Sequence, residues 1–239
     1  MKKTIGANTT KLTLKDAVAN DRYRKATWVN IGYIIFHELT GINVIMLYSH
    51  QMLVEMQGKS SPFTPKQGTY LVGVINMFSS LISTQTVKFF GRRTLVVWGH
   101  MFIAIIHCSI GLLNNAGNDI GVLVMLLMFL FVYQNTSGPV AWLYAAETTI
   151  DAALGICLLT LWGTVFILSL VCPILMSDPK DGGLGQSNVF FMLSGLAVLG
   201  SLYSYFALVE TRGLSDKEKK LIFTPEKYKV EEPMSNQIE

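Results

Sequence analysis

Six long apolar runs divide this chain of 239 residues, and five of them contain no aspartate, glutamate, lysine or arginine. The first run contains a single charged residue, Glu38. A bilayer core about 30 Å thick needs about 20 apolar residues per helix. In lipid, backbone polar groups must be satisfied within the segment, so each run predicts a membrane-spanning helix. The predicted spans are residues 27–52, 68–87, 94–113, 120–146, 156–176 and 189–209.

The basic residues predict how these spans are oriented. Charged residues make up only 15% of the chain, against about 25% in soluble domains. All but three of the 19 lysines and arginines lie before the first span, between the second and third, or after the sixth. Basic loops stay on the cytosolic side. We therefore expect an integral membrane protein with both termini cytosolic, or on the matrix side of a mitochondrial inner membrane. Its segments would be a basic tail (1–25), a membrane domain (26–210) and a polar tail (211–239).

Several function classes find no support in the sequence. It contains no phosphate-binding loop, no Ser/His/Asp arrangement and no Cys/His pattern with metal-ligand spacing, so we expect no enzyme activity, no cofactor and no metal. Its basic residues are not interleaved with aromatic residues, so we expect no nucleic-acid partner. Membrane lipids are the expected surroundings.

The first span has an unusual polar cluster. His37, Glu38, Thr40 and Asn43 lie within seven residues, with Gly41 among them. Polar groups are costly inside a membrane and often mark a functional site. If the helix unwinds at Gly41, His37 and Asn43 can both face one cavity, as in the discontinuous helices of transporters. The alternative is a hydrogen-bond cluster between helices that binds no ligand.

Two other spans carry candidate binding residues. The Asn76 amide in the second span can recognise sugar hydroxyls or join two helices. In the fourth span, Pro139 removes a backbone hydrogen bond and predicts a bend. Trp142 follows about one turn later, where its indole can stack on a sugar ring or simply pack against the bend.

Five short motifs occur in a fixed order along the chain. They are Leu39–Asn43, Gly73–Asn76, Gly91–Leu95, Gly138–Trp142 with Glu147, and Glu210–Ser215. In this order they resemble the C-terminal half of the sugar porter family, within the major facilitator superfamily. The resemblance implies an all-α membrane protein whose six transmembrane helices form one half of a major-facilitator bundle.

The resemblance also implies roles for individual residues. By position, the substrate-binding set is His37, Glu38, Asn43, Tyr48, Asn76, Trp142 and Trp162. Within this set, Asn43 and Asn76 match sugar-binding amides, Trp142 matches a sugar-stacking tryptophan and Tyr48 matches a gating tyrosine. A cytosolic charge network that latches the outward-facing state is implied for Arg92, Arg93, Glu147, Glu210 and Arg212.

The chain departs from the family at several of these positions. The family has two glutamines where this chain has His37 and Glu38, and an acidic residue where it has Lys88. After Glu147, residues 148–155 lack the arginine that the family places in its Pro-x-x-x-Arg-Gly loop. Losing one partner of a partly buried ion pair leaves a costly lone charge. We therefore expect the network to be dismantled.

The number of spans bears on function as well. Family members have about twelve helices in two halves, with the substrate between them, and this sequence has room for one half. We expect it not to transport alone. It would be an accessory or structural subunit of a larger membrane complex, its transport function decayed. The alternative is a hexose transporter assembled from two half-chains, with an N-terminal-half chain as partner. Further hypotheses are that it is a substrate sensor, a fragment of a longer gene product or a carrier of another solute.

Overall fold

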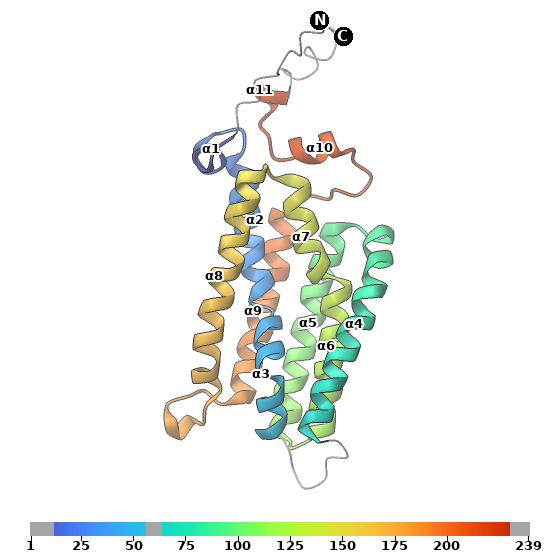
Figure 1. Ribbon diagram of the computed structural model, residues 1–239, viewed down its shortest axis with the longest axis vertical. Coiled ribbons are helices and arrows are strands. Elements are labelled where there is room, and N and C mark those ends of the chain that lie inside the picture. Colours follow the sequence, from blue (N-terminus) through green and yellow to red (C-terminus); the bar gives the residue numbers. More distant parts are fainter. Residues whose placement is uncertain (1–11, 56–63, 230–239) are drawn as a thin grey trace, which may run out of the picture.

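A computed structural model describes residues 12–55 and 64–229. Within these ranges all the regular elements are helices, and the longer ones run side by side in one bundle (Figure 1). The elements are α1 (Leu14–Ala19), α2 (Arg24–Glu38), α3 (Ile42–Glu55), α4 (Pro65–Phe89), α5 (Arg92–Asn115), α6 (Asp119–Asn135), α7 (Ser137–Thr148), α8 (Asp151–Met176), the short 3-10 helix η1 (Pro179–Asp181), α9 (Gln186–Ala207), α10 (Asp216–Leu221) and α11 (Glu226–Lys229).

The six predicted spans correspond to six passes along the bundle. The pairs α2–α3 and α6–α7 each make one pass, and α4, α5, α8 and α9 make one pass each (Figure 1). Within the described residues, five passes are long and apolar enough to cross a membrane. The other pass, α4, has 25 residues but is less apolar. The helices extend beyond the predicted spans: α8 begins at Asp151, whose carboxylate in the first turn suits the positive end of a helix dipole.

The first pass is interrupted at Gly41, as one of the two interpretations of the sequence requires. Helix α2 ends at Glu38 and α3 begins at Ile42. Gly41 has φ +83°, a backbone conformation that residues with a Cβ adopt only at a cost. The interruption also frees carbonyl groups for other partners: the Thr40 carbonyl lies 2.9 Å from Nε2 of His107 on α5. Because of this break, the polar residues before and after Gly41 do not follow one continuous helix.

The fourth pass is interrupted near its proline. Helix α6 ends at Asn135 and α7 begins at Ser137, and Thr136 between them has φ −128° and ψ −92°. Pro139 lies in the first turn of α7, where its missing N–H costs least. The predicted bend is therefore a break three residues before the proline. The two interrupted passes lie against each other, and Tyr33 and Tyr144 meet edge to face with ring centroids 6.2 Å apart.

Helices α5 and α9 pack closely against each other. Ser201 on α9 donates a hydrogen bond to the Val97 carbonyl at 2.9 Å, and Ser194 donates to the Ala104 carbonyl at 2.7 Å. A Cβ on Gly200 would collide with the His100 ring. Small residues allow the close approach of membrane helices. The small residues Ser194, Gly200 and Ser201 of α9 therefore pack against α5 inside the bundle.

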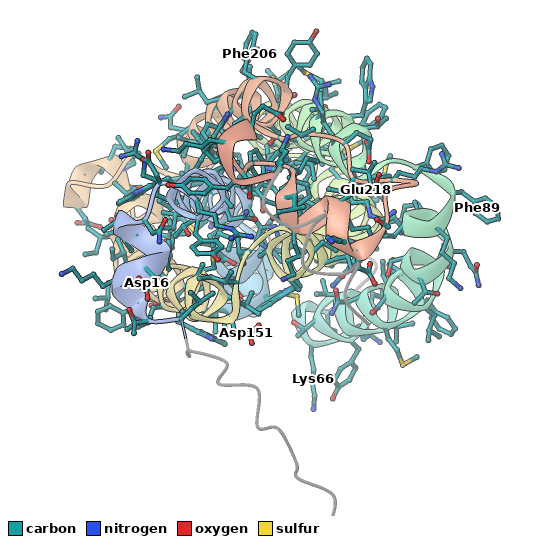
Figure 2. All side chains as sticks on the ribbon, turned by 90° about the horizontal axis from the view of Figure 1, so that it is seen from above. Asp16, Lys66, Phe89, Asp151, Phe206 and Glu218 are labelled. Atoms are coloured by element: carbon teal, nitrogen blue, oxygen red, sulfur yellow. The ribbon has the colours of Figure 1, made fainter. Side chains whose placement is uncertain are left out.

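One end of the bundle carries most of the described polar segments. Helices α1, α10 and α11 lie there, together with the α4–α5 and α7–α8 connections (Figure 1). Seen from this end, the segment with Glu218 lies across the helix ends, while Phe89 and Phe206 point outward (Figure 2). These two phenylalanines are 67% and 80% exposed, as expected for side chains that face lipid.

Candidate functional site

A cavity of about 330 Å³ lies between the two interrupted passes, α4 and α8. This volume is at the lower end of the range of about 300–1,000 Å³ typical of small-molecule sites. The residues around it are His37, Glu38, Ile42, Asn43, Ser80, Ser83, Tyr133, Gln134, Gly138, Pro139, Trp142, Leu161 and Trp162. Both helix breaks therefore contribute residues to the cavity.

His37, at the end of α2, is held in place by the opposite break. Its Nδ1 lies 3.0 Å from Oγ of Ser137, and its Nε2 lies 2.9 Å from the hydroxyl of Tyr133. His37 is 1% exposed, and a buried imidazole needs a partner for each nitrogen. The hydrogen bonds tie the end of α2 to the α6–α7 break and fix the orientation of the ring.

Glu38 and Asn43 form a pair across the Gly41 break. Asn43 Nδ2 donates a hydrogen bond to Oε2 of Glu38 at 2.5 Å. Glu38 is 2% exposed, and its Oε1 lies 3.7 Å from Nε2 of His37. A hydrogen bond to a carboxylate is stronger than one between neutral groups. The hydrogen bond therefore joins the end of α2 to the start of α3 and fixes both polar groups at the cavity wall.

The remaining walls combine aromatic and polar side chains. Trp142 on α7 and Trp162 on α8 are 47% and 64% exposed and border the cavity. Ser80 and Ser83 come from α4 and Gln134 from α6. Indole faces pack on apolar ring faces, while hydroxyl and amide groups exchange hydrogen bonds with hydroxyls. This wall has the composition needed to hold a polar ring-shaped solute.

Five of the seven predicted binding residues border the cavity: His37, Glu38, Asn43, Trp142 and Trp162. The other two, Asn76 and Tyr48, do not. Asn76 accepts a hydrogen bond from Gln134 Nε2 at 2.5 Å, so it lies behind a cavity residue. Tyr48 donates to the Ser169 carbonyl on α8 at 2.8 Å. The roles that the resemblance implies for these two residues stay predictions.

Two important cavity residues, Tyr133 and Gln134, were not predicted from the sequence. Tyr133 is 6% exposed and contacts His37, while Gln134 links the cavity to α4 through Asn76. Both stand at the end of α6, directly before the break. The predicted bend at Pro139 offered a signal, because polar groups next to a helix break commonly line a site.

A second polar site lies at the end of the bundle that carries α10. Glu147, near the end of α7, accepts from Arg92 Nη2 at 3.0 Å and from Lys219 Nζ at 3.1 Å. Its other oxygen accepts from the Thr211 hydroxyl at 3.0 Å. Glu147, Arg92 and Lys219 side chains are only 11%, 15% and 13% exposed. The hydrogen bond to Glu147 raises the pKa of Lys219 above its ordinary value.

Glu210 connects the same site to the start of α5. Its Oε1 accepts from the backbone N–H groups of Arg92 at 2.8 Å and of Thr211 and Arg212 at 3.0 Å. A carboxylate at a helix N-terminus is stabilised by unpaired N–H groups and the helix dipole. Arg93 donates to the Tyr205 carbonyl at 2.5 Å and its guanidinium lies over the Tyr205 ring. It therefore holds α9 and does not contact Glu147.

The expectation that Glu147 is left as a lone charge is wrong. The loop arginine is missing, but Lys219 comes from α10, 72 positions along the chain, and supplies a second cation. Lys220 adds a hydrogen bond to the Ala146 carbonyl at 2.7 Å and another to the Thr149 carbonyl. Lys88 is exposed in the last turn of α4, where a cation is favourable. Glu147 is therefore paired with Arg92 and Lys219, and Lys219 takes the place of the missing loop arginine.

Comparison with known proteins places these features in a family. Residues 1–223 match the family described as "Sugar (and other) transporter". The chain is 30% identical over 220 residues to the putative metabolite transport protein YncC of Bacillus subtilis, which covers 87% of this chain and 44% of that protein. It is 26% identical over 210 residues to the D-xylose-proton symporter of Escherichia coli, and the match covers 85% of this chain and 42% of that protein.

Solved structures show the same fold. A double tryptophan mutant of XylE superposes with a TM-score of 0.74 at 23% identity, over 83% of this chain and 43% of that one. The inward-open xylose transporter XylE from E. coli gives a TM-score of 0.69 at 24% identity, over 82% and 42%. The chain spans about half the length of these relatives or less.

Proposed function

This chain belongs to the sugar (and other) transporter family, and we propose that it forms one wall of a sugar-binding site in a transporter. The other wall would be a second six-helix half. The observation that carries the proposal is the cavity between the two helix breaks. There Gln134 and the two serines offer hydrogen-bond partners beside two exposed indoles, which is the chemistry that binds a hexose-sized polyol.

The charge cluster supports a role in the transport cycle. Glu147, Arg92 and Lys219 join three separate elements, α7, α5 and α10, at one end of the bundle. A set of ion pairs between moving elements can favour one of two conformations. We infer that this end is cytosolic, because most described basic residues lie there. On that orientation the cluster stabilises a state in which the cytosolic side is closed.

One observation favours a second candidate, the accessory subunit with decayed transport. The amide of Asn43 is engaged with Glu38 at 2.5 Å, so it is not free to contact a sugar while that bond persists. Glu38, one of the two residues that depart from the family's glutamines, accepts this bond. A subunit of a larger membrane complex would retain the bundle and have no need of free amides.

Purification from native membrane separates the candidates. Recovery in mild detergent with a protein that supplies an N-terminal-type half, or as a longer polypeptide containing one, supports the transporter. Stoichiometric recovery within one large complex of unrelated subunits supports the accessory role.

Uptake of labelled hexose into proteoliposomes, using the material as purified, tests the activity. We expect saturable uptake that Trp142→Ala abolishes. The matched control is Trp98→Ala, because Trp98 is a 59% exposed tryptophan on α5 that does not border the cavity. Uptake that is absent, or equal in both variants, would contradict the proposed function.

A further inference from the structure

We propose that the cavity selects sugar-sized solutes that carry a protonated amine, with Glu38 as the group that pairs with the amine. Because this names the substrate class of the same cavity, it rests on the function proposed above. The geometry behind it is a carboxylate that borders the cavity but has almost no exposed surface. Glu38 is 2% exposed and borders the cavity.

An ionised carboxylate in such a place needs a positive partner. Withdrawing a charge from water is costly unless it is paired. Among the described residues that border the cavity there is no lysine or arginine. The group that holds Glu38 is the neutral amide of Asn43, which donates one hydrogen bond at 2.5 Å. An amide stabilises a carboxylate but supplies no net charge.

His37 is the nearest group that could carry a charge, and its contacts assign it to another role. Both ring nitrogens already have hydroxyl partners, at 3.0 Å on Ser137 and 2.9 Å on Tyr133. Its Nε2 is 3.7 Å from Glu38, beyond hydrogen-bond distance. One ring nitrogen donating and the other accepting satisfies a neutral imidazole completely. On this proposal the solute supplies the countercharge that the described cavity residues do not.

The rest of the cavity fits an amine on a sugar-sized molecule. Cations are attracted to indole faces, and the indoles of Trp142 and Trp162 border the same cavity with about half or more of their surface exposed. The same indoles can cover the apolar face of a sugar ring. Ser80 and Gln134 remain for neutral hydroxyl groups. Amine and ring are thus recognised by different groups.

The test is an equilibrium titration of the purified protein in lipid nanodiscs, followed by tryptophan fluorescence. The probes are D-glucosamine, D-glucose and N-acetyl-D-glucosamine, at about pH 6.5, where a primary amine is protonated. We expect glucosamine to bind at least 10-fold more tightly than glucose, and the neutral acetylated sugar to bind no more tightly than glucose. Glu38→Gln should reduce the preference to within 2-fold, since a glutamine oxygen still accepts from Asn43.

The outcomes distinguish this inference from the proposed function. Equal binding of glucose and glucosamine to the unmodified protein overturns the amine preference and leaves the sugar site standing. A preference that persists in Glu38→Gln overturns the role of Glu38. If no sugar changes the fluorescence, the proposed function fails, and the inference fails with it. Because the comparison between sugars on the unmodified protein needs no variant, misfolding of Glu38→Gln cannot hide the answer.

Discussion

Replacing Lys219 by methionine tests the rebuilt charge cluster most directly. The methionine keeps an unbranched apolar stem and removes the ammonium that lies 3.1 Å from Oε1 of Glu147. Lys219 and Glu147 are 13% and 11% exposed, so the pair is shielded from water more than a surface ion pair. Exposed pairs contribute about 0–1 kcal/mol, whereas breaking a fully buried pair costs about 3–5 kcal/mol.

The loss from Lys219→Met should lie between these limits. Arg92 remains 3.0 Å from Glu147 after the change, so the carboxylate keeps one cation. A hydrogen bond to a charged group contributes about 1.5–3 kcal/mol, and we expect a loss of about 2 kcal/mol. On the scaling for domains of 150–250 residues, the thermal midpoint falls by about 4–8 °C.

The assay is thermal unfolding of the purified protein in detergent. Lys25→Met is the matched control, since Lys25 is an exposed lysine in the first turn of α2, and α2 begins at the same end of the bundle (Figure 1). The double variant Lys219→Met with Glu147→Gln should lose less than the sum of the single losses, with a coupling energy of about 1 kcal/mol or more. Equal midpoints for Lys219→Met and Lys25→Met, or strictly additive losses, would refute the reasoning.

Three further predictions follow from single features. Gly41→Ala should weaken hexose binding in titration and lower stability by about 1–2 kcal/mol, because φ +83° is strained for alanine; unchanged binding would show that the break does not position Asn43. Gly91→Ala should lower the thermal midpoint, because a Cβ there collides with the Glu210 carboxylate; an unaltered midpoint would contradict this. Because the folded-state pKa of Lys219 is raised, its contribution to the free energy of unfolding is complete below about pH 10.4 and is lost as pH rises through that raised pKa. The stability difference between the parent and Lys219→Met should therefore persist at about pH 7–9 and shrink only above about pH 10.4; a difference already lost at about pH 7–9 would contradict the assignment.

Much of the fold was predictable because a membrane constrains a sequence strongly. A run such as 189–209 has no charged residue, and only a helix satisfies its backbone in lipid. The break at Gly41 was predictable from glycine next to a polar cluster, and the structure confirms it. The orientation of the termini and the domain limits stay predictions.

The candidate site was only partly predictable, because its contacts join distant residues. Nothing near Glu147 indicates that Lys219 replaces the missing arginine, since the partner is set by how α10 folds back. Tyr133 sits at the end of an apolar helix and reads as a packing residue until its contact with His37 is known. The Asn43–Glu38 bond depends on the helix break itself. In each case three-dimensional proximity decides what the residue does.

Equilibrium dialysis with a labelled hexose tests the central claim, that the cavity between the two breaks is a sugar site. The account predicts saturable binding of one hexose per chain to the protein as purified. It also predicts that Trp142→Ala, which removes an indole at the cavity wall, weakens binding at least 10-fold while Trp98→Ala leaves it unchanged. Binding that is absent, or that both variants weaken equally, would contradict the claim.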